Sequence, residues 1–195
     1  MFPGAPTLTL LIGTGLAHAG WTETDREHGC IFFRGETEAS GATAVRVECE
    51  WDVDPAALRA VLGSPGGHRT IFASLKDSET LSRVGGVERV RQVHQASGAS
   101  DREVVVDVTT HDVPGGQRYA WTKSRDQSGR RTDGVEPELT DGFWEVTDRA
   151  GGVLLVYETR YLAGGSVPAF LVRWFQGAGI KAVIGDLRAH MDQVR

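Results

Sequence analysis

The sequence predicts an α+β fold in which a curved antiparallel sheet wraps around one long C-terminal helix. Three observations predict it. Five segments after residue 81 alternate apolar and polar residues with the period of two that strands have. The links between them are glycine-containing and mostly too short for a parallel crossover. The final segment repeats its apolar residues every three to four positions, as one face of a helix does.

The five strands are expected at residues 87–95, 103–110, 117–125, 142–147 and 153–162. The long helix is expected after Gly164-Gly165, with Ser166 as its cap, Pro168 in its first turn and its apolar face continuing to Val194. Gly177 and Gly179 interrupt that face, each at a cost of about 1 kcal/mol relative to Ala.

A hairpin carrying both cysteines is predicted near the start of the domain. Cys30 and Cys49 lie in two segments rich in β-branched and aromatic residues. A turn centred between Ala39 and Ser40 pairs the two cysteines directly, whereas a turn centred at Ser40-Gly41 places Trp51 opposite Cys30. We expect a disulfide if the compartment is oxidising. Two buried, inert thiols are the alternative.

A small helical insert is expected after this first hairpin. Asp54 can cap a short helix over residues 55–62, because Pro55 suits the first helical position. The glycine-rich segment 63–67 ends it. A further helical turn over residues 70–76 is expected to point three apolar side chains inward: Ile71, Phe72 and Leu75.

The first twenty residues form an uncharged leader. Residues 8–16 are mostly apolar, and Ala17-His18-Ala19 has the small-x-small pattern of a signal-peptidase site. We expect residues 1–19 to be a signal peptide cleaved between Ala19 and Gly20, leaving a periplasmic or secreted domain over residues 20–195. A basic n-region is missing, so an N-terminal element packed on a cytoplasmic domain is the alternative.

The composition bounds the class of protein. The chain has 195 residues, which suits one domain, and 26 acidic against 21 basic residues, which argues against a nucleic-acid partner. No apolar run reaches the roughly 20 residues that span a bilayer. Most of the 25 glycines lie at strand ends. We expect a monomer.

Three segments resemble one protein superfamily. They are Ser100-Asp101-Arg102-Glu103-Val104-Val105, Gly142-Phe143-Trp144-Glu145-Val146, and Val156-Tyr157 followed by Gly164-Gly165-Ser166-Val167-Pro168-Ala169-Phe170-Leu171-Val172. Together with Asp186-Leu187-Arg188 they are similar to the START-like (SRPBCC) superfamily of lipid-transfer and polyketide-cyclase-like proteins, over about residues 21–190. Phe170 stands where that superfamily often has Trp, and Ala163 where Pro is frequent.

The resemblance implies a helix-grip fold with a hydrophobic cavity for a lipid or other apolar small molecule. Candidate ligand-binding residues are Phe72, Arg102, Tyr119, Trp121, Trp144, Tyr157, Tyr161, Phe170 and Trp174. For each aromatic residue, packing in the core is the alternative. Arg102 and Tyr157 are candidates to orient the ligand head, although Asp101-Arg102 also reads as a structural ion pair at the sheet rim.

Catalytic, metal and cofactor sites are not predicted. The histidines lack HxxxH or HExxH spacing, and no nucleophile motif or phosphate-binding loop occurs. His94 faces either the cavity or solvent, depending on the strand register. Arg173-Trp174-Phe175 has an alternative reading as an edge that touches a membrane transiently.

The function expected from these observations is the non-catalytic binding or transfer of a lipid or related apolar molecule by an exported START-like protein. Two alternatives stay open. One is an enzyme of the aromatase/cyclase or hydratase kind on the same fold, and the other is a chaperone-like binder of a protein partner.

Overall fold

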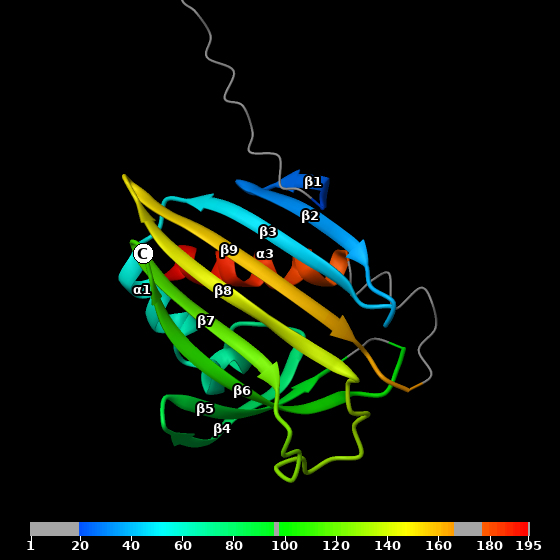
Figure 1. Cartoon of the computed structure of the whole chain (residues 1–195). Coiled ribbons are helices and arrows are strands. Elements are labelled where there is room, and N and C mark those ends of the chain that lie inside the picture. Colours follow the sequence, from blue (N-terminus) through cyan, green and yellow to red (C-terminus); the bar gives the residue numbers. More distant parts are fainter. Residues whose placement is uncertain (1–19, 96–97, 166–176, 195) are drawn as a thin grey trace, which may run out of the picture.

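The computed structural model describes residues 20–95, 98–165 and 177–194 of the chain. The described elements begin with three strands and end with a helix (Figure 1). In chain order they are β1 (Trp21–Glu27), β2 (Cys30–Thr37), β3 (Thr43–Trp51), α1 (Pro55–Leu62), the 3₁₀ helix η1 (Pro65–Thr70), β4 (Leu75–Val84), β5 (Val87–His94), β6 (Arg102–Val113), β7 (Gly116–Lys123), β8 (Leu139–Arg149), β9 (Gly152–Leu162) and α3 (Ala178–Gln193).

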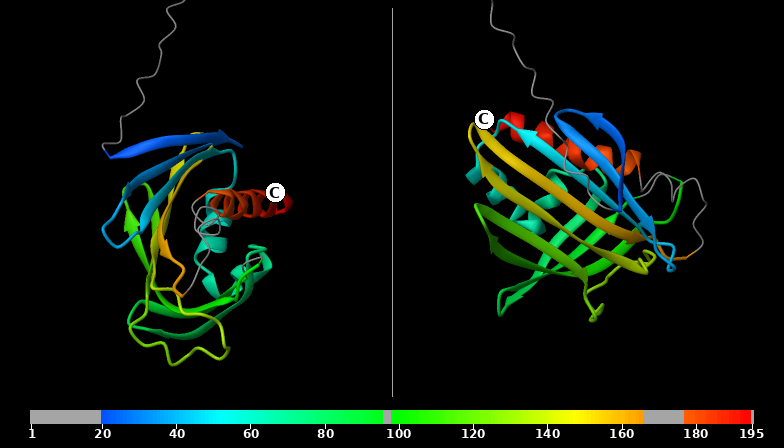
Figure 2. Two further views of the ribbon diagram at one scale, coloured as in Figure 1. Left: turned by 90° about the vertical axis from the view of Figure 1, so that its right-hand side faces the viewer. Right: turned by 45° about the horizontal axis from the view of Figure 1, so that its top comes forward.

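The strands form one antiparallel sheet in the order β1-β2-β3-β9-β8-β7-β6-β5-β4. Strands that are neighbours along the chain pair with one another, as predicted, except for β3 and β4: β3 pairs with β9, and β4 lies at the far edge of the sheet. The sheet curves around α3, and α1 lies on the same concave side (Figure 2). The main core lies between this concave face and the two helices, with Leu58 of α1 and Leu187 of α3 both fully buried.

The strand β1 was not predicted, because its sequence does not alternate apolar with polar residues. It is an edge strand whose exposed residues are polar or charged, and such residues discourage pairing with another chain. His28 and Gly29 join it to β2 with positive φ angles of 53° and 74°, which a two-residue hairpin turn of this kind requires. The first hairpin is therefore β1–β2.

The position of β1 corrects the placement of the helical insert. α1 and η1 follow β3, so they come after the second hairpin rather than the first. Asp54 accepts hydrogen bonds from the backbone N–H groups of Ala56 and Ala57, which is the expected N-cap. The predicted helical turn over residues 70–76 is wrong, since η1 ends at Thr70 and Leu75 begins β4.

The second hairpin settles the register of the cysteines. Cys30 lies directly opposite Cys49, and the two are joined by a disulfide. The alternative register, with Trp51 opposite Cys30, is not the observed one. Both cysteines are buried in the main core beneath α3.

Helix α3 is held on the sheet by polar contacts at three places. The Asp186 carboxylate accepts a 2.8 Å hydrogen bond from the backbone N–H of Ala73. The Arg188 guanidinium lies 5.4 Å from the centre of the Trp51 ring. Lys181 forms ion pairs with Asp25 and Glu27 of β1. The cap and first turn expected at Ser166 and Pro168 lie outside the described residues, and the described helix begins after Gly177.

A buried carboxylate fixes the connection between β7 and β8 against the convex face of the sheet. The fully buried Glu103 accepts hydrogen bonds from Arg91 Nε at 2.6 Å and from the backbone N–H groups of Arg131 and Thr132, each at 2.8 Å. Burial alone would raise the pKa of Glu103, but these donors outweigh it and lower the pKa to about 2.

We predict that the disulfide contributes about 3 kcal/mol to the free energy of unfolding, because it closes a loop between residues 19 positions apart in the sequence. Urea unfolding of the wild type with and without reductant measures this difference. The Cys30→Ala/Cys49→Ala variant is the control, since reductant should leave its stability unchanged. Equal stability of the wild type in both conditions would contradict the prediction.

Candidate functional site

A cavity of about 370 Å³ lies inside the curve of the sheet. Its walls come from the concave faces of β3 and β5–β9, from η1 and the segment after it, and from the start of α3. This volume lies within the range that small-molecule sites occupy. The sheet is too strongly curved for one helix to fill, so the space between them remains.

One side of the cavity is a chain of aromatic rings. Trp144 of β8 and Tyr157 of β9 are direct cross-strand partners with ring centres 4.1 Å apart. The Tyr157 ring also lies 5.9 Å from Trp121, and the Trp144 ring stacks on Phe72 at 6.2 Å. These rings form a continuous apolar surface that suits the body of a hydrophobic molecule.

Gly142 creates the space that Trp121 occupies. The two residues are cross-strand partners. A Cβ atom at position 142 would lie 2.5 Å from Cζ2 of Trp121 and 2.2 Å from the carbonyl oxygen of Glu158. Only glycine therefore allows the indole to lie across the sheet at this point. This explains physically why the predicted strand carries glycine two positions before Trp144.

His68 of η1 closes the aromatic end of the cavity. Its Nε2 lies 3.1 Å from the carbonyl oxygen of Val61, so Nε2 carries the proton that is donated. Its ring meets Phe72 edge-on at 5.2 Å. Burial lowers the pKa of His68 to about 4, because the charged form would lose its water. The ring is therefore neutral at pH 7.

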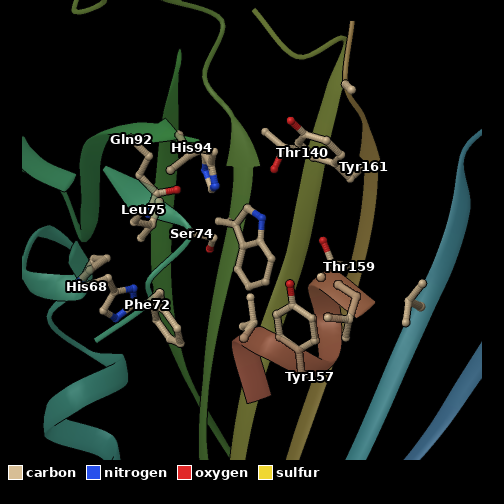
Figure 3. A pocket seen from close by; sticks show the side chains of 18 of the residues that line it. His68, Phe72, Ser74, Leu75, Gln92, His94, Thr140, Tyr157, Thr159 and Tyr161 are labelled. Atoms are coloured by element: carbon tan, nitrogen blue, oxygen red, sulfur yellow. The ribbon is translucent and has the colours of Figure 1, made fainter. Parts of the chain in front are cut away.

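The other end of the cavity is polar (Figure 3). Gln92 and His94 of β5 project from one wall, and the cross-strand partners Thr140 and Tyr161 from the opposite wall. Burial lowers the pKa of His94 to about 4 and raises the pKa of Tyr161 to about 12. Both side chains are uncharged near neutral pH.

Six of the nine predicted ligand-binding residues line the cavity: Phe72, Tyr119, Trp121, Trp144, Tyr157 and Tyr161. Their alternative role as core residues holds at the same time for Phe72, Tyr119, Trp144 and Tyr157, which are also buried against the main core. Phe170 and Trp174 lie outside the described residues.

Arg102 is placed differently from the prediction. Its buried guanidinium donates hydrogen bonds to the backbone carbonyl oxygens of Ser100, Ala163 and Gly164, and it is not among the residues that line the cavity. Asp101 pairs instead with Lys76 at 2.8 Å. Arg102 therefore joins the start of β6 to the backbone that follows β9.

The sequence analysis did not identify the polar residues of the lining, or did not decide which face of the sheet they occupy. Gln92 and Thr140 were not identified, and His94 was assigned to either face. The signal lay in the alternation of β5, where Val90, Gln92 and His94 share one face, but the pattern does not say which face is concave. Among the described residues, no three acidic, histidine or cysteine side chains gather as a metal site would.

No protein-family model matches the chain, and no curated protein matches its sequence. Solved structures do match its fold. The STAR-related lipid transfer protein from Xanthomonas axonopodis superimposes with a TM-score of 0.78, at 20% identity, covering 89% of this chain and 99% of that one. Human StAR-related lipid transfer protein 5 gives a TM-score of 0.80, at 16% identity, covering 91% and 88%. The chain has a START-like fold.

The START-like fold also includes enzymes. The Zhui aromatase/cyclase from Streptomyces sp. R1128 matches with a TM-score of 0.59, at 12% identity, covering 79% of this chain and 96% of that one. Identities this low establish the fold and leave the ligand open. Within the described ranges, no helix combines the length and the apolar character needed to cross a membrane.

We predict that His68 makes the START-like domain less stable as the pH falls from 6.5 to 4. The unfolded chain binds a proton in this window and the folded chain does not, so up to about 3 kcal/mol is lost. His68→Gln retains an N–H donor for Val61 without the titration, and its unfolding free energy should depend less on pH there.

Urea unfolding at a series of pH values measures the effect of His68. His111→Gln is the matched control, because His111 is exposed on β6. An unchanged pH dependence in His68→Gln would contradict the prediction. Glu103 does not confuse the result, since its stabilisation is lost only as the pH falls from 4.5 towards 2.

Proposed function

We propose that this chain binds a lipid or another hydrophobic small molecule in its internal cavity and carries it without catalysing a reaction. The observation that carries the proposal is the cavity of about 370 Å³ with its aromatic wall, which lies between the sheet and α3. An apolar ligand would gain roughly 25 cal/mol for each Å² of apolar surface removed from water there. The fold likeness to lipid-transfer proteins supports the same role.

The chemistry of the lining supports a binding role over catalysis. The histidines that line the cavity are His68, which donates to a backbone carbonyl, and His94, which has no hydrogen-bond partner within the described residues. Neither is hydrogen-bonded to a serine or threonine hydroxyl, as the base of an activated nucleophile would be. A lipid carrier needs no such pair of nucleophile and base.

An aromatase/cyclase-type enzyme is the second candidate. It is favoured by the fold likeness to the Streptomyces enzyme and by the orientation of His94 into the cavity. Product formed from a panel of polyketide-like substrates, and lost in His94→Ala, would favour this candidate over the carrier.

We also propose that residues 1–19 are a signal peptide and that residues 20–195 form the exported ligand-binding domain. The uncharged leader and the Ala-x-Ala pattern support this, and the disulfide is compatible with an oxidising compartment. We expect the exported domain to be monomeric and to touch membranes transiently. The segment Arg173-Trp174-Phe175, the candidate contact, lies outside the described residues.

We predict that protein purified under native conditions carries a lipid or other apolar molecule, detected by organic extraction and mass spectrometry. Val183→Trp should remove most of it, because Val183 lines the cavity from α3 and the larger ring takes up its volume. Ala182→Trp is the matched control on the exposed side of the same helix. Wild-type protein that holds no ligand and takes none from a lipid panel would overturn the proposal.

N-terminal sequencing of the secreted protein tests the export proposal. The mature chain should begin at Gly20, since cleavage follows Ala19. Protein found in the cytoplasm with Met1 or Phe2 at its start would contradict it. The ligand test does not depend on this outcome, because the described cavity lining runs from Thr43 to Val183.

A further inference from the structure

We infer that the ligand of this cavity is an uncharged amphiphile, with an apolar body against the aromatic wall and a hydroxyl, carbonyl or ester group at the polar end beside Gln92, His94 and Thr140. The inference rests on the proposed function and names the class of molecule within it. It excludes fatty-acid carboxylates and phosphate-bearing lipids as the preferred ligands. Three observations carry it.

The first observation is the sign of the charge around the cavity. None of the described lining residues is a lysine or an arginine. Glu138 is the charged residue among them, and it is exposed at the edge of the site. The buried guanidinium of Arg102 lies behind the end of β9, but it is not part of the lining and donates its hydrogen bonds to the backbone carbonyl oxygens of Ser100, Ala163 and Gly164. A carboxylate or phosphate would therefore lose its water without a lysine or arginine of the described lining to pair with, which is a large unfavourable term.

The second observation concerns the two histidines of the lining. A protonated imidazole could have supplied a positive charge, but burial keeps both His68 and His94 neutral near pH 7. The Nε2–H group of His68 is already donated to the carbonyl oxygen of Val61. The histidines therefore offer a ligand no cation at neutral pH.

The third observation is that the polar end has unused hydrogen-bonding groups. The side chains of Gln92, His94 and Thr140 face the cavity and have no hydrogen-bond partner within the described part of the protein. Amide, neutral imidazole and hydroxyl groups each both donate and accept. Such a set complements an uncharged oxygen group, and a buried polar group without a partner is costly.

Three other polar side chains of the lining are already hydrogen-bonded within the protein. The hydroxyl group of Thr159 donates to the carbonyl oxygen of Asp141 at 3.0 Å, and that of Thr43 lies 2.8 Å from the hydroxyl of Thr37. The side-chain amide of Gln95 donates to the carbonyl oxygen of Ala73 at 2.8 Å. The ligand's polar group is thereby directed to one end of the cavity, while the aromatic rings occupy the other.

Binding of 1-hexadecanol and of hexadecanoate at pH 8 tests the inference, because the two probes share a chain and differ in head charge. Trp121 and Trp144 line the cavity and provide a fluorescence signal. We expect the wild type to bind the alcohol at least about tenfold more tightly. Equal or tighter binding of hexadecanoate would overturn the inference, and this comparison needs no variant.

Gln92→Lys tests the cause of the selectivity. A cation at the polar end should raise the affinity for hexadecanoate and lower the alcohol-to-acid ratio by about tenfold or more. Thr122→Lys is the matched control, because it adds the same charge on the exposed face of β7 and should leave the ratio unchanged. Thr140→Lys is the second variant if Gln92→Lys fails to fold. A ratio that stays the same in a folded lysine variant would contradict the argument.

The failure of the inference can be told apart from the failure of the proposed function. A charged lipid extracted from the native protein would overturn the inference and leave ligand binding in place. If neither probe binds and native extraction yields no apolar molecule, both fail together.

Discussion

The curvature of the sheet is the constraint on which the rest of the structure depends. Nine antiparallel strands bend around a single long helix, and α3 and α1 together cannot fill the concave side. Protein interiors are normally packed to the density of organic crystals, so an unfilled volume of this size is a specific feature of the fold. Arg102 stabilises this curvature, because its guanidinium hydrogen-bonds the start of β6 to the backbone that follows β9.

The two faces of the sheet differ in the number of charged side chains that they carry. The convex face carries direct cross-strand ion pairs, such as Arg118 with Glu145 and Arg160 with Asp141. Each exposed pair contributes little stability, but together they specify strand register. On the concave face, the described cavity lining has aromatic rings and neutral polar groups in their place, apart from the exposed Glu138 at its edge. The sheet therefore presents charged pairs to solvent on one side and an aromatic wall to the cavity on the other.

The sequence predicted the fold class and most of the strands, because those segments alternate clearly and are separated by glycine turns. It did not predict β1, whose polar residues carry no such alternation, or β4, whose first residues were expected to form a helical turn. Large aromatic residues were identified as the cavity wall because their size makes them conspicuous. Gln92 and Thr140 were missed, and the ligand-binding and structural readings of Arg102 were left open, because the role of a polar side chain depends on which strands lie opposite it in space.

The pairing of β3 with β9 has a consequence for how the chain folds. Residues 44–51 of β3 pair with residues 153–160 of β9, so this contact spans more than half of the chain. Contacts so distant in sequence close slowly, since the entropy of the intervening loop must be overcome first. The first three strands are synthesised early but can join the sheet only when the last strand arrives. Until then, the exposed edge of β3 is the part of the nascent chain most open to mispairing and to capture by a chaperone.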